Sequence, residues 1–532
     1  NLKMIIILTG QANKFSLPCC TYIFNRSRDN MTIYNLNFGI GWASSGVEYA
    51  QLYRRNILHD LNEDFKFIFL DFINKENIQT LTSNLGIEND EVIWIYQYFT
   101  DIKIKPTSYT IENIIEKLES NDVKVKSIKP KVKRIYFNNK SCYVNCYLKY
   151  KNEDIVDRAE FVSSGKLIRK EFYTYTKVFT EYYAPYNKKA KVYLRKFFNE
   201  NGSVAYEEIV KDDDNMYIFP NKILYSKKEF IGYFISQLNL KDKDILLVDR
   251  SKNIGQVILE NKKEGHVGVV IHAEHYNHSN TNDQYVLWNN NYEYVFNNAQ
   301  HIDFFIVATE DQKAVLQLQF EKYKNLKPKI YTIPVGNIKY LKFEQQRKPF
   351  SVITASRLAN EKHVDWLIKA VIKAHKINDD IRFDIYGEGS ERQKLQQIID
   401  NYQANNYIHL KGHMDLTYIY KSYELYLSGS TSEGFGLTLM EAVGSGLGII
   451  GLDVYYGNTT FIKNNVNGYR VPIDITNLDE DTLITELTSK LLLFFTQDNE
   501  KTRAESYKIA NNYLIGNIKE KWKNLIDEVL ND

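Results

Sequence analysis

The stretch that decides the fold of this chain is Leu427-Ser-Gly-Ser-Thr-Ser-Glu433-Gly434-Phe435-Gly436-Leu437-Thr438-Leu439-Met440-Glu441-Ala442. Its pattern predicts a short strand, a glycine-rich turn and the first turns of a helix. Gly434 and Gly436 allow the backbone to approach a ligand closely, and the unpaired N–H groups at the helix start favour phosphate or another anion. Glu433 in the turn and Glu441 on the helix then face one crevice. Taken alone, the stretch also fits an ordinary strand-turn-helix with two solvated glutamates.

The composition is that of a globular protein with several domains. Its 532 residues exceed the size of one hydrophobic core, so two or three domains are expected. Hydrophobic residues make up 44% and charged residues 25%, and the formal net charge of +2 gives no sign of nucleic-acid binding. No apolar run approaches the ~20 residues of a membrane-spanning helix, so none is predicted.

Cysteine is sparse, with Cys19, Cys20, Cys142 and Cys146 spread over the chain. Cys142 and Cys146 fall in an alternating, strand-like segment, where four residues span about 13 Å and exceed the reach of a disulfide. Their spacing also lacks the paired motif of a zinc site. The sequence therefore predicts reduced thiols and a cytoplasmic protein.

The N-terminal residues 1–30 form a leader of doubtful origin. Their apolar core, residues 4–8, is shorter than the apolar region of a signal peptide. We expect a non-native or mis-started leader with Met31 as the functional start. The alternative is a weak export signal.

Residues 31–120 predict the first part of an N-terminal Rossmann-like domain. Residues 32–38 alternate like a strand, residues 39–46 form a glycine-rich turn, and a helix follows from Val47. In a doubly wound domain the amides at such a helix start face the crevice. The glycine spacing differs from the dinucleotide fingerprint, whose third glycine follows the second by three residues, so an NAD enzyme is disfavoured.

Residues 121–219 change to short alternating runs separated by polar turns, and Asn201-Gly202 is a strong hairpin signal. This pattern predicts an antiparallel β-meander inserted into the N-terminal domain, which resumes over residues 220–340. The meander serves protein contacts or simply stabilises the domain. Within it, the acidic run 212–214 fits a solvated turn better than a metal–nucleotide site, because strand-like runs flank it.

A second polar cluster follows the strand-like run 266–272, which ends at His272-Ala-Glu274. Parallel sheets bind their ligands at the C-terminal ends of strands. His272 is able there to donate to a sugar hydroxyl or to carry a proton. A structural histidine at a strand end is the other interpretation.

Residues 341–532 predict a second Rossmann-like domain that ends in a long, mostly polar terminal helix. Arg357 and Lys362 lie on the loop after its first strand. Two fixed cations at this place neutralise a departing diphosphate and replace the metal ion of metal-dependent transferases. The sequence therefore predicts a site that needs no metal and no other cofactor.

Three motifs together resemble the retaining GT-B glycosyltransferases of family 4: Ser-Arg357-Leu-x-x-x-Lys362, Tyr-Gly387-Glu-Gly389 and Glu433-Gly-Phe-Gly-x-x-x-x-Glu441. The resemblance covers most of residues 220–500. Residues 31–51 and the meander narrow it to the branch that glycosylates serine-rich repeat adhesins in the accessory-Sec system of Gram-positive bacteria. It implies an α/β fold of the GT-B type, in which two Rossmann-like, doubly wound domains face a cleft.

The resemblance also implies an activity and partners. The reaction would move N-acetylglucosamine from UDP-GlcNAc to Ser/Thr hydroxyls of a serine-rich repeat protein acceptor, with UDP-glucose as the other possible donor. The partners would be this acceptor and a homologous, non-catalytic subunit, without nucleic acid. The location would be cytoplasmic, at most peripheral at the inner face of the membrane.

Carried over to this sequence, the resemblance assigns three overlapping sets of residues. The catalytic residues are Glu433, His272, Arg357 and Lys362. The UDP-binding residues are Gly46, Val47, Glu48, Tyr49, Arg357, Lys362, His413, Met414, Leu437, Thr438 and Glu441. The sugar-binding residues are His272, Glu433, Gly434, Phe435 and Gly436. In this assignment the two cations grip the diphosphate, backbone groups at His413-Met414 hold the nucleobase, and Glu441 binds ribose hydroxyls.

Two chemical routes give retention. In the first, the acceptor hydroxyl attacks the face that UDP leaves, the leaving oxygen takes the proton, and Arg357 and Lys362 stabilise the developing charge. In the second, Glu433 is a nucleophile, as in retaining glycosidases, whose two carboxylates lie about 5 Å apart. Only one carboxylate is expected near the anomeric carbon, which favours the first route.

Other functions fit parts of the sequence. A non-catalytic, chaperone-like subunit is disfavoured, because a binding-only copy need not keep Glu433, Glu441, Arg357 and Lys362 together. A transferase acting on a lipid or a polysaccharide is disfavoured mildly by the meander. A sugar phosphorylase would release sugar phosphate. The residues alone do not distinguish N-acetylglucosamine from glucose as the transferred sugar.

Overall fold

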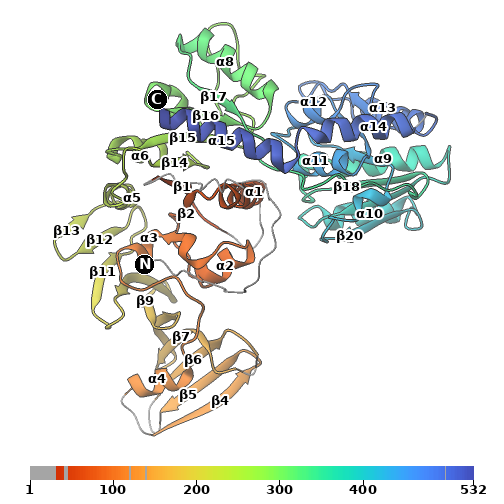
Figure 1. The fold of residues 1–532 in the computed structure, drawn as a ribbon. Helices are drawn as coiled ribbons and strands as arrows, with labels where there is room; N and C mark the ends of the chain where they lie inside the picture. Colours follow the sequence, from red (N-terminus) through yellow and green to blue (C-terminus); the bar gives the residue numbers. More distant parts are fainter. Residues whose placement is uncertain are drawn as a thin grey trace, which may run out of the picture.

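The computed structural model describes residues 31–40, 46–118, 122–137, 141–151, 153–497 and 499–531, and these residues form three sheets (Figure 1). The predicted leader, residues 1–30 with Cys19 and Cys20, lies outside the described residues, as does the 41–45 part of the predicted glycine-rich turn. Cys142 and Cys146 are free thiols, as predicted. In the part that is described, no helix is long and apolar enough to cross a membrane.

The N-terminal lobe is built on a parallel sheet that has seven strands within the described residues. The strands are β1 (Thr32–Asn37), β2 (Asp64–Phe69), β3 (Val92–Trp94), β14 (Ile245–Val248), β15 (His266–Ile271), β16 (Phe304–Val307) and β17 (Ile330–Thr332). Their spatial order is β17-β16-β15-β14-β1-β2-β3. The chain therefore reverses its direction of travel across the sheet between β1 and β14. Such a switch point is where open parallel sheets bind ligands.

Helices cover this sheet because its strands are apolar on both faces, as the all-buried β14 illustrates. The helices of this lobe are α1 (Gly46–Asp60), α2 (Ile78–Asn84), α3 (Ile95–Tyr98), α5 (Lys227–Gln237), α6 (Gly255–Asn261), α7 (Glu293–Asn297) and α8 (Glu310–Lys324). Helix α1 follows β1 and begins at the switch point, as the sequence predicts for the first helix.

The predicted meander is an antiparallel sheet of ten strands within the described residues, in the order β13 to β4. The strands are β4 (Val123–Lys129), β5 (Val132–Phe137), β6 (Cys142–Leu148), β7 (Val156–Ser163), β8 (Lys166–Tyr173), β9 (Lys177–Tyr186), β10 (Lys189–Phe198), β11 (Val204–Ile209), β12 (Met216–Phe219) and β13 (Lys222–Leu224). The Asn201-Gly202 turn joins β10 to β11, and residues 212–214 form an exposed turn before β12.

One end of the inserted sheet is packed into the N-terminal lobe. Phe179, Phe197, Tyr206 and Tyr217 are buried in the hydrophobic core of the N-terminal lobe. The distant strands form a separate small core with α4 (Ile111–Lys117). Figure 1 shows the sheet extending away from the lobe, with β4 at its far end.

The C-terminal lobe is built on a parallel sheet of six strands within the described residues, in the order β20-β19-β18-β21-β22-β23. The strands are β18 (Ser351–Ala355), β19 (Arg382–Tyr386), β20 (Ile408–Gly412), β21 (Leu425–Ser428), β22 (Gly448–Leu452) and β23 (Gly468–Val471). The helices are α9 (Val364–His375), α10 (Arg392–Asn401), α11 (Leu437–Gly444), α12 (Gly457–Phe461), α13 (Glu480–Phe494) and α14 (Asn499–Asn511). The second switch point lies between β18 and β21, the strands that precede the predicted Arg357 loop and the Glu433 turn.

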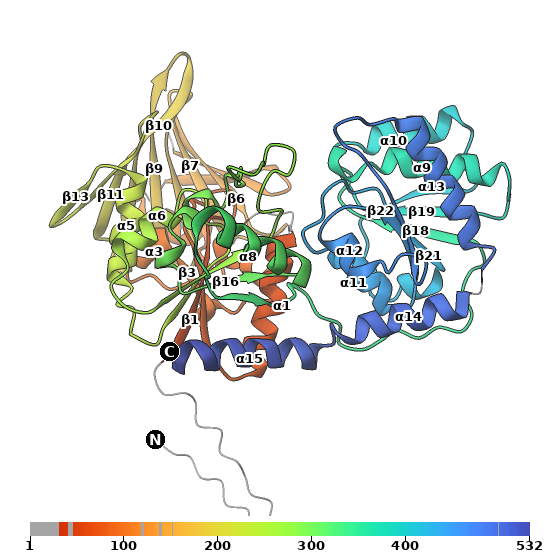
Figure 2. The same cartoon turned by 90° about the horizontal axis from the view of Figure 1, so that it is seen from above.

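The last helix corrects the predicted domain assignment. The sequence analysis placed one mostly polar tail in the C-terminal domain, but the chain breaks after α14 and continues as α15 (Ile515–Asn531). Helix α15 crosses to the N-terminal lobe and lies along it (Figure 2). The cause is an apolar stripe at helical spacing, which is buried in the N-terminal core. The residues of this stripe are Ile518, Trp522, Leu525, Ile526 and Val529.

Candidate active site

The two lobes meet where the turn after β21, at the C-terminal switch point, faces the loop after β15 of the N-terminal sheet. A Cβ atom added to Gly434, in the turn after β21, would lie 2.6 Å from the carbonyl oxygen of His272, after β15. The two backbones come this close only because residue 434 has no side chain. Beside this contact, Ser432 Oγ donates to Glu274 Oε2 at 3.4 Å across the lobe boundary. The structure thus brings together the predicted sugar-binding residues of both lobes.

A buried histidine holds the lobes together next to this contact. The hydroxyl of Tyr456, in the C-terminal lobe, lies 3.1 Å from Nδ1 of His275, and His275 Nε2 lies 2.9 Å from Gln319 Oε1. Burial lowers the pKa of His275 to about 4, so the ring is neutral. The neutral ring donates from Nε2 to the amide oxygen and accepts at Nδ1 from the tyrosine.

Glu433 and Lys362 form an ion pair in the cleft. Lys362 Nζ lies 2.7 Å from Glu433 Oε2, and the side chains are 20% and 21% exposed. Lys362 ends the short 3₁₀ helix η3 (Asn360–Lys362), after β18. The predicted phosphate-binding cation therefore forms an ion pair with the predicted catalytic carboxylate.

Arg357 lies apart from this pair. Its guanidinium is 2.7 Å from Glu361 Oε1, and its side chain is 72% exposed. Its loop is fixed through the backbone, because Gly387 has a φ of +130° and a Cβ there would lie 1.8 Å from the carbonyl oxygen of Ser356. The Gly387-Glu-Gly389 motif thus supports the Arg357 loop.

Helix α11 begins as the sequence predicts. Gly436, with a φ of 86°, is its N-cap, and Leu437 and Thr438 form its first turn. Phe435 departs from the predicted role, because its ring is 4% exposed and lies 5.2 Å from the ring of Phe461 in the core. A sugar is therefore able to meet residue 435 only through the backbone.

Glu441 lies on α11 near Tyr53 of α1, which belongs to the other lobe. Burial raises the pKa of Glu441 to about 7, and the nearby cation of Lys342 opposes this shift. Sequence reasoning missed Lys342 and Tyr53. Neither lies in a motif, and only the packing of the lobes brings them to Glu441.

His272 has a partner that sequence reasoning also missed. Its Nε2 lies 2.8 Å from Oδ1 of Asp249, which is fully buried. Although burial raises the pKa of Asp249, Arg54 and His272 outweigh burial and hold this pKa well below its usual range. The sequence signal that could have identified Asp249 is its position directly after an apolar parallel strand, at the end of the strand where ligands bind.

The remaining predicted UDP-binding residues lie at the ends of β1 and β20. Gly46 and Val47 start α1, Tyr49 is 41% exposed, and Glu48 is buried with Arg250 at 3.5 Å. After β20, His413 and Met414 form part of an exposed loop. The roles of these residues stay predictions.

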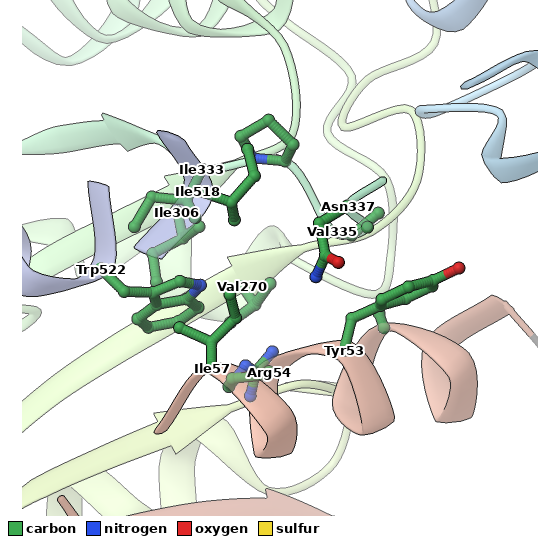
Figure 3. A pocket seen from close by; sticks show the side chains of 13 residues that line it. Tyr53, Arg54, Ile57, Val270, Ile306, Ile333, Val335, Asn337, Ile518 and Trp522 are labelled. Carbon is green, nitrogen blue, oxygen red and sulfur yellow. The ribbon is translucent and has the colours of Figure 1, made fainter. Parts of the chain in front are cut away.

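Two pockets have linings that contain neither Glu433 nor Lys362, so both lie outside the cleft. One lies behind it, between α1, residues 333–337 and α15, where Arg54 and Asn337 face each other across the cavity (Figure 3). The other lies between the N-terminal lobe and the inserted sheet, at the C-terminal ends of β2 and β3. It is lined by polar and aromatic side chains that include Asn74, Glu76, Asn77, Trp94, Gln97 and Phe172. Among the residues described, no group of three or more His, Cys, Asp or Glu side chains is placed to hold a metal ion.

Two family models match the chain. Residues 339–481 match the model described as "Glycosyl transferases group 1", and residues 125–221 match the "GtfA extended beta-sheet domain". With its two facing parallel α/β lobes, the chain is a GT-B glycosyltransferase.

The chain is also similar to known proteins over nearly its whole length. It is 47% identical to the UDP-N-acetylglucosamine–peptide N-acetylglucosaminyltransferase GtfA subunit of Streptococcus gordonii, over 94% of this chain and 99% of that protein. The pneumococcal O-GlcNAc transferase GtfA, crystallised with UDP and GlcNAc, is 49% identical with a TM-score of 0.88, over 95% of this chain and 100% of that one. A GtfA/B complex structure matches at 47% identity and a TM-score of 0.89, over 94% and 100%.

The chain belongs to the GtfA family of peptide N-acetylglucosaminyltransferase subunits. The resemblance inferred from the motifs is thereby confirmed. The predicted fold, two Rossmann-like lobes with an inserted antiparallel sheet, is confirmed as well.

Proposed function

We propose that this chain transfers N-acetylglucosamine from UDP-N-acetylglucosamine to Ser/Thr hydroxyls of a serine-rich repeat protein, with retention at the anomeric carbon. The observation that carries the proposal is the contact of Gly434, in the turn after β21, with His272, after β15. The Lys362–Glu433 pair adjoins this contact, the start of α11 with Glu441 follows it in the chain, and the chain belongs to the GtfA family; these observations support the proposal.

Different residues of the proposed site bind the diphosphate, the ribose and the nucleobase of the donor. The N–H groups of Leu437 and Thr438, at the N-terminus of α11, receive the diphosphate together with Lys362. Glu441 accepts hydrogen bonds from ribose hydroxyls, and the loop at His413-Met414 holds the nucleobase. On binding, the diphosphate competes with Glu433 for Lys362, which frees the carboxylate to bind the sugar.

The transfer follows the front-face route. The bond between the anomeric carbon and the leaving phosphate oxygen breaks, and the acceptor oxygen bonds to that carbon on the same face. The leaving oxygen takes the acceptor proton, while Lys362 and Arg357 stabilise the negative charge that develops. In this assignment Glu433 is the one carboxylate that contacts the sugar, whereas retaining glycosidases use two, which supports this route over double displacement. A trapped glycosyl–Glu433 adduct would contradict it.

The acceptor and the partner subunit are proposed to use the inserted sheet. The polar pocket at the ends of β2 and β3 lies on the ligand-binding edge of the N-terminal sheet and continues onto the insertion. The outermost strand, β4, is exposed along most of its length. A homologous, non-catalytic GtfB-like subunit is the proposed partner, in line with the GtfA/B complex.

A cytoplasmic location stays a prediction, which cell fractionation tests.

The test uses the full chain with the partner subunit, a serine-rich acceptor, and either UDP-N-acetylglucosamine or UDP-glucose. We expect UDP release with the first donor, and N-acetylhexosamine increments in the intact mass of the acceptor. Glu433→Gln should lower kcat more than it weakens UDP binding. Hexose increments, transfer only to a lipid or polysaccharide, or phosphate-dependent release of sugar phosphate would each overturn the proposal.

The same assay tests whether the reaction needs a metal. Because Arg357, Lys362 and the α11 N–H groups neutralise the diphosphate, turnover should persist in the presence of a chelator. Loss of turnover with the chelator and recovery with manganese would contradict this assignment.

A further inference from the structure

A buried carboxylate connects His272 to helix α1. Asp249 Oδ1 accepts from His272 Nε2 at 2.8 Å and from Arg54 at 2.7 Å. Its Oδ2 accepts from Arg54 at 2.9 Å and from Gln51 Nε2 at 2.9 Å. Each oxygen of Asp249 thus accepts two hydrogen bonds. The side chains of Gln51, Arg54 and His272 fix the carboxylate in place.

Arg54 is held as firmly as the carboxylate. Its guanidinium also donates to Asn35 Oδ1 at 2.8 Å and lies 5.4 Å from the ring centroid of Trp522 on α15. The Arg54 and Asp249 side chains are 3% and 0% exposed. A guanidinium that pairs with a carboxylate through two parallel bonds imposes a defined geometry on it. Figure 3 shows Arg54 among the apolar side chains of the cavity behind the cleft.

The backbone of His272 is fixed separately from its ring. The hydroxyl of Tyr292 accepts from the N–H groups of His272 and Ala273 at 3.0 and 3.1 Å, and Gly434 closes on the carbonyl oxygen. These contacts leave rotation of the ring undetermined, so the bond to Asp249 is what orients it. An ionised carboxylate only accepts, so the proton on Nε2 points to Asp249 and Nδ1 is the ring nitrogen free to act on substrate.

We propose that Asp249 is a positioning residue for transfer, holding the His272 ring in one tautomer and one orientation towards the donor sugar, with Arg54 as its support. This inference rests on the proposed function, because it concerns turnover of the donor. A buried ion pair alone is weak evidence for stability, since apolar replacements of such pairs are often neutral. The hydrogen bond that His272 Nε2 donates to Asp249 Oδ1 is what points to a role at the site.

A double-mutant cycle separates positioning from mere structure. Asp249→Glu keeps the charge but moves the carboxylate by one methylene, which displaces the ring. We expect kcat to fall by about ten- to a hundred-fold, while KM for UDP-N-acetylglucosamine changes by less than about three-fold. In the His272→Ala background the same change should lower kcat by less than about two-fold, because the group through which Asp249 acts is gone.

The matched control is Asp244→Glu, at the other end of the same strand. Asp244 is also buried, and it accepts from the backbone N–H groups of Thr32 and Lys241 at 2.8 Å each. The Asp244→Glu variant should leave kcat unchanged. Arg54→Lys is a second test if Asp249→Glu does not fold. It keeps the positive charge but loses the two parallel hydrogen bonds of the guanidinium. Its loss of kcat should also disappear in the His272→Ala background.

The outcomes are distinguishable. An equal loss of kcat in the presence and absence of His272, or no loss with a folded Asp249→Glu, would overturn the positioning role. Failure of the wild-type complex to release UDP with donor and acceptor would instead overturn the proposed function, before any variants are compared. Thermal unfolding midpoints of all variants establish that the assayed proteins are folded.

Discussion

Arg357 is a predicted phosphate-binding residue that the structure shows paired with a neighbouring carboxylate. It forms an exposed i,i+4 pair with Glu361, and such surface pairs contribute only about 0–1 kcal/mol. In the proposed complex a diphosphate, with more negative charge and several acceptor oxygens, displaces Glu361 at little cost, and the Arg357 side chain turns to the phosphate as the donor binds.

Arg357→Ala tests this role. Because the cation stabilises charge that develops as the diphosphate leaves, kcat should fall by about 10²-fold, and UDP binding should weaken less. Release of UDP gives kcat, and titration calorimetry gives the Kd of UDP. Arg392→Ala is the control, because Arg392 forms a similar i,i+4 pair with Glu388 in the same lobe. Full turnover by Arg357→Ala would remove Arg357 from the site.

In the proposed site, Glu441 should make donor binding depend on pH. Burial raises the pKa of this carboxyl to about 7, so it is largely protonated below neutral pH. Only the ionised form accepts hydrogen bonds at both oxygens, so UDP affinity should fall by about ten-fold per pH unit once pH is below 7. Comparing the Kd of wild type with Glu441→Gln at each pH cancels the titration of UDP itself. Parallel profiles would show that Glu441 does not bind the nucleoside.

Among the elements, the candidate site is made by two loops, one that follows β15 of the N-terminal sheet and one that follows β21 of the C-terminal sheet. Each loop is positioned by its own lobe, and Gly434 against His272 is where the two loops touch. Because the contact is backbone to backbone, it fixes how far the lobes close. The polar contact of Tyr456 with His275 lies alongside it.

Gly434→Ala should hold the lobes slightly open. The added Cβ would lie 2.6 Å from a backbone oxygen, a clash relieved by separating the lobes. We expect kcat to fall by about ten-fold or more, with the thermal midpoint nearly unchanged. Small-angle scattering should show a larger radius of gyration. Gly516→Ala, on α15, is the control, because nothing lies within 4 Å of its added Cβ. Equal kcat values for the two variants would mean that the contact does not limit closure.

At the scale of the whole molecule, α15 joins the two lobes. It begins after the C-terminal lobe and is buried against the N-terminal lobe, beside α1. Its Trp522 covers Arg54, and through Arg54 it reaches Asp249 and His272. The end of the chain thus supports the site from behind the cleft.

Trp522→Ala should destabilise the N-terminal lobe. The side chain is 5% exposed, and a buried Trp→Ala change costs about 3–5 kcal/mol. Urea denaturation followed by circular dichroism measures the loss. Leu493→Ala on α13 is the control, because Leu493 is 40% exposed and should change stability by less than about 0.5 kcal/mol. Equal unfolding midpoints would show that α15 docks only loosely.

The sequence by itself determined the local units. Period-two runs and glycine positions predicted the strands, the inserted meander and the Asn201-Gly202 turn, because these depend on neighbours in the chain. The turn at Glu433 and the start of α11 followed from one short stretch. The family resemblance rested on the same local motifs, and the relatives confirm it.

Only the tertiary structure decided which side chains meet. Arg54 and Asp249 are 195 residues apart, and Lys362 and Glu433 are 71 apart, yet each pair is in contact. The docking of α15 on the opposite lobe and the burial that shifts the pKa of Glu441 also depend on contacts between distant parts of the chain. The hydrophobic periodicity of a helix or strand indicates which of its faces is buried, but it does not indicate which other element covers that face. These contacts exist only after the sheets and the two lobes have packed.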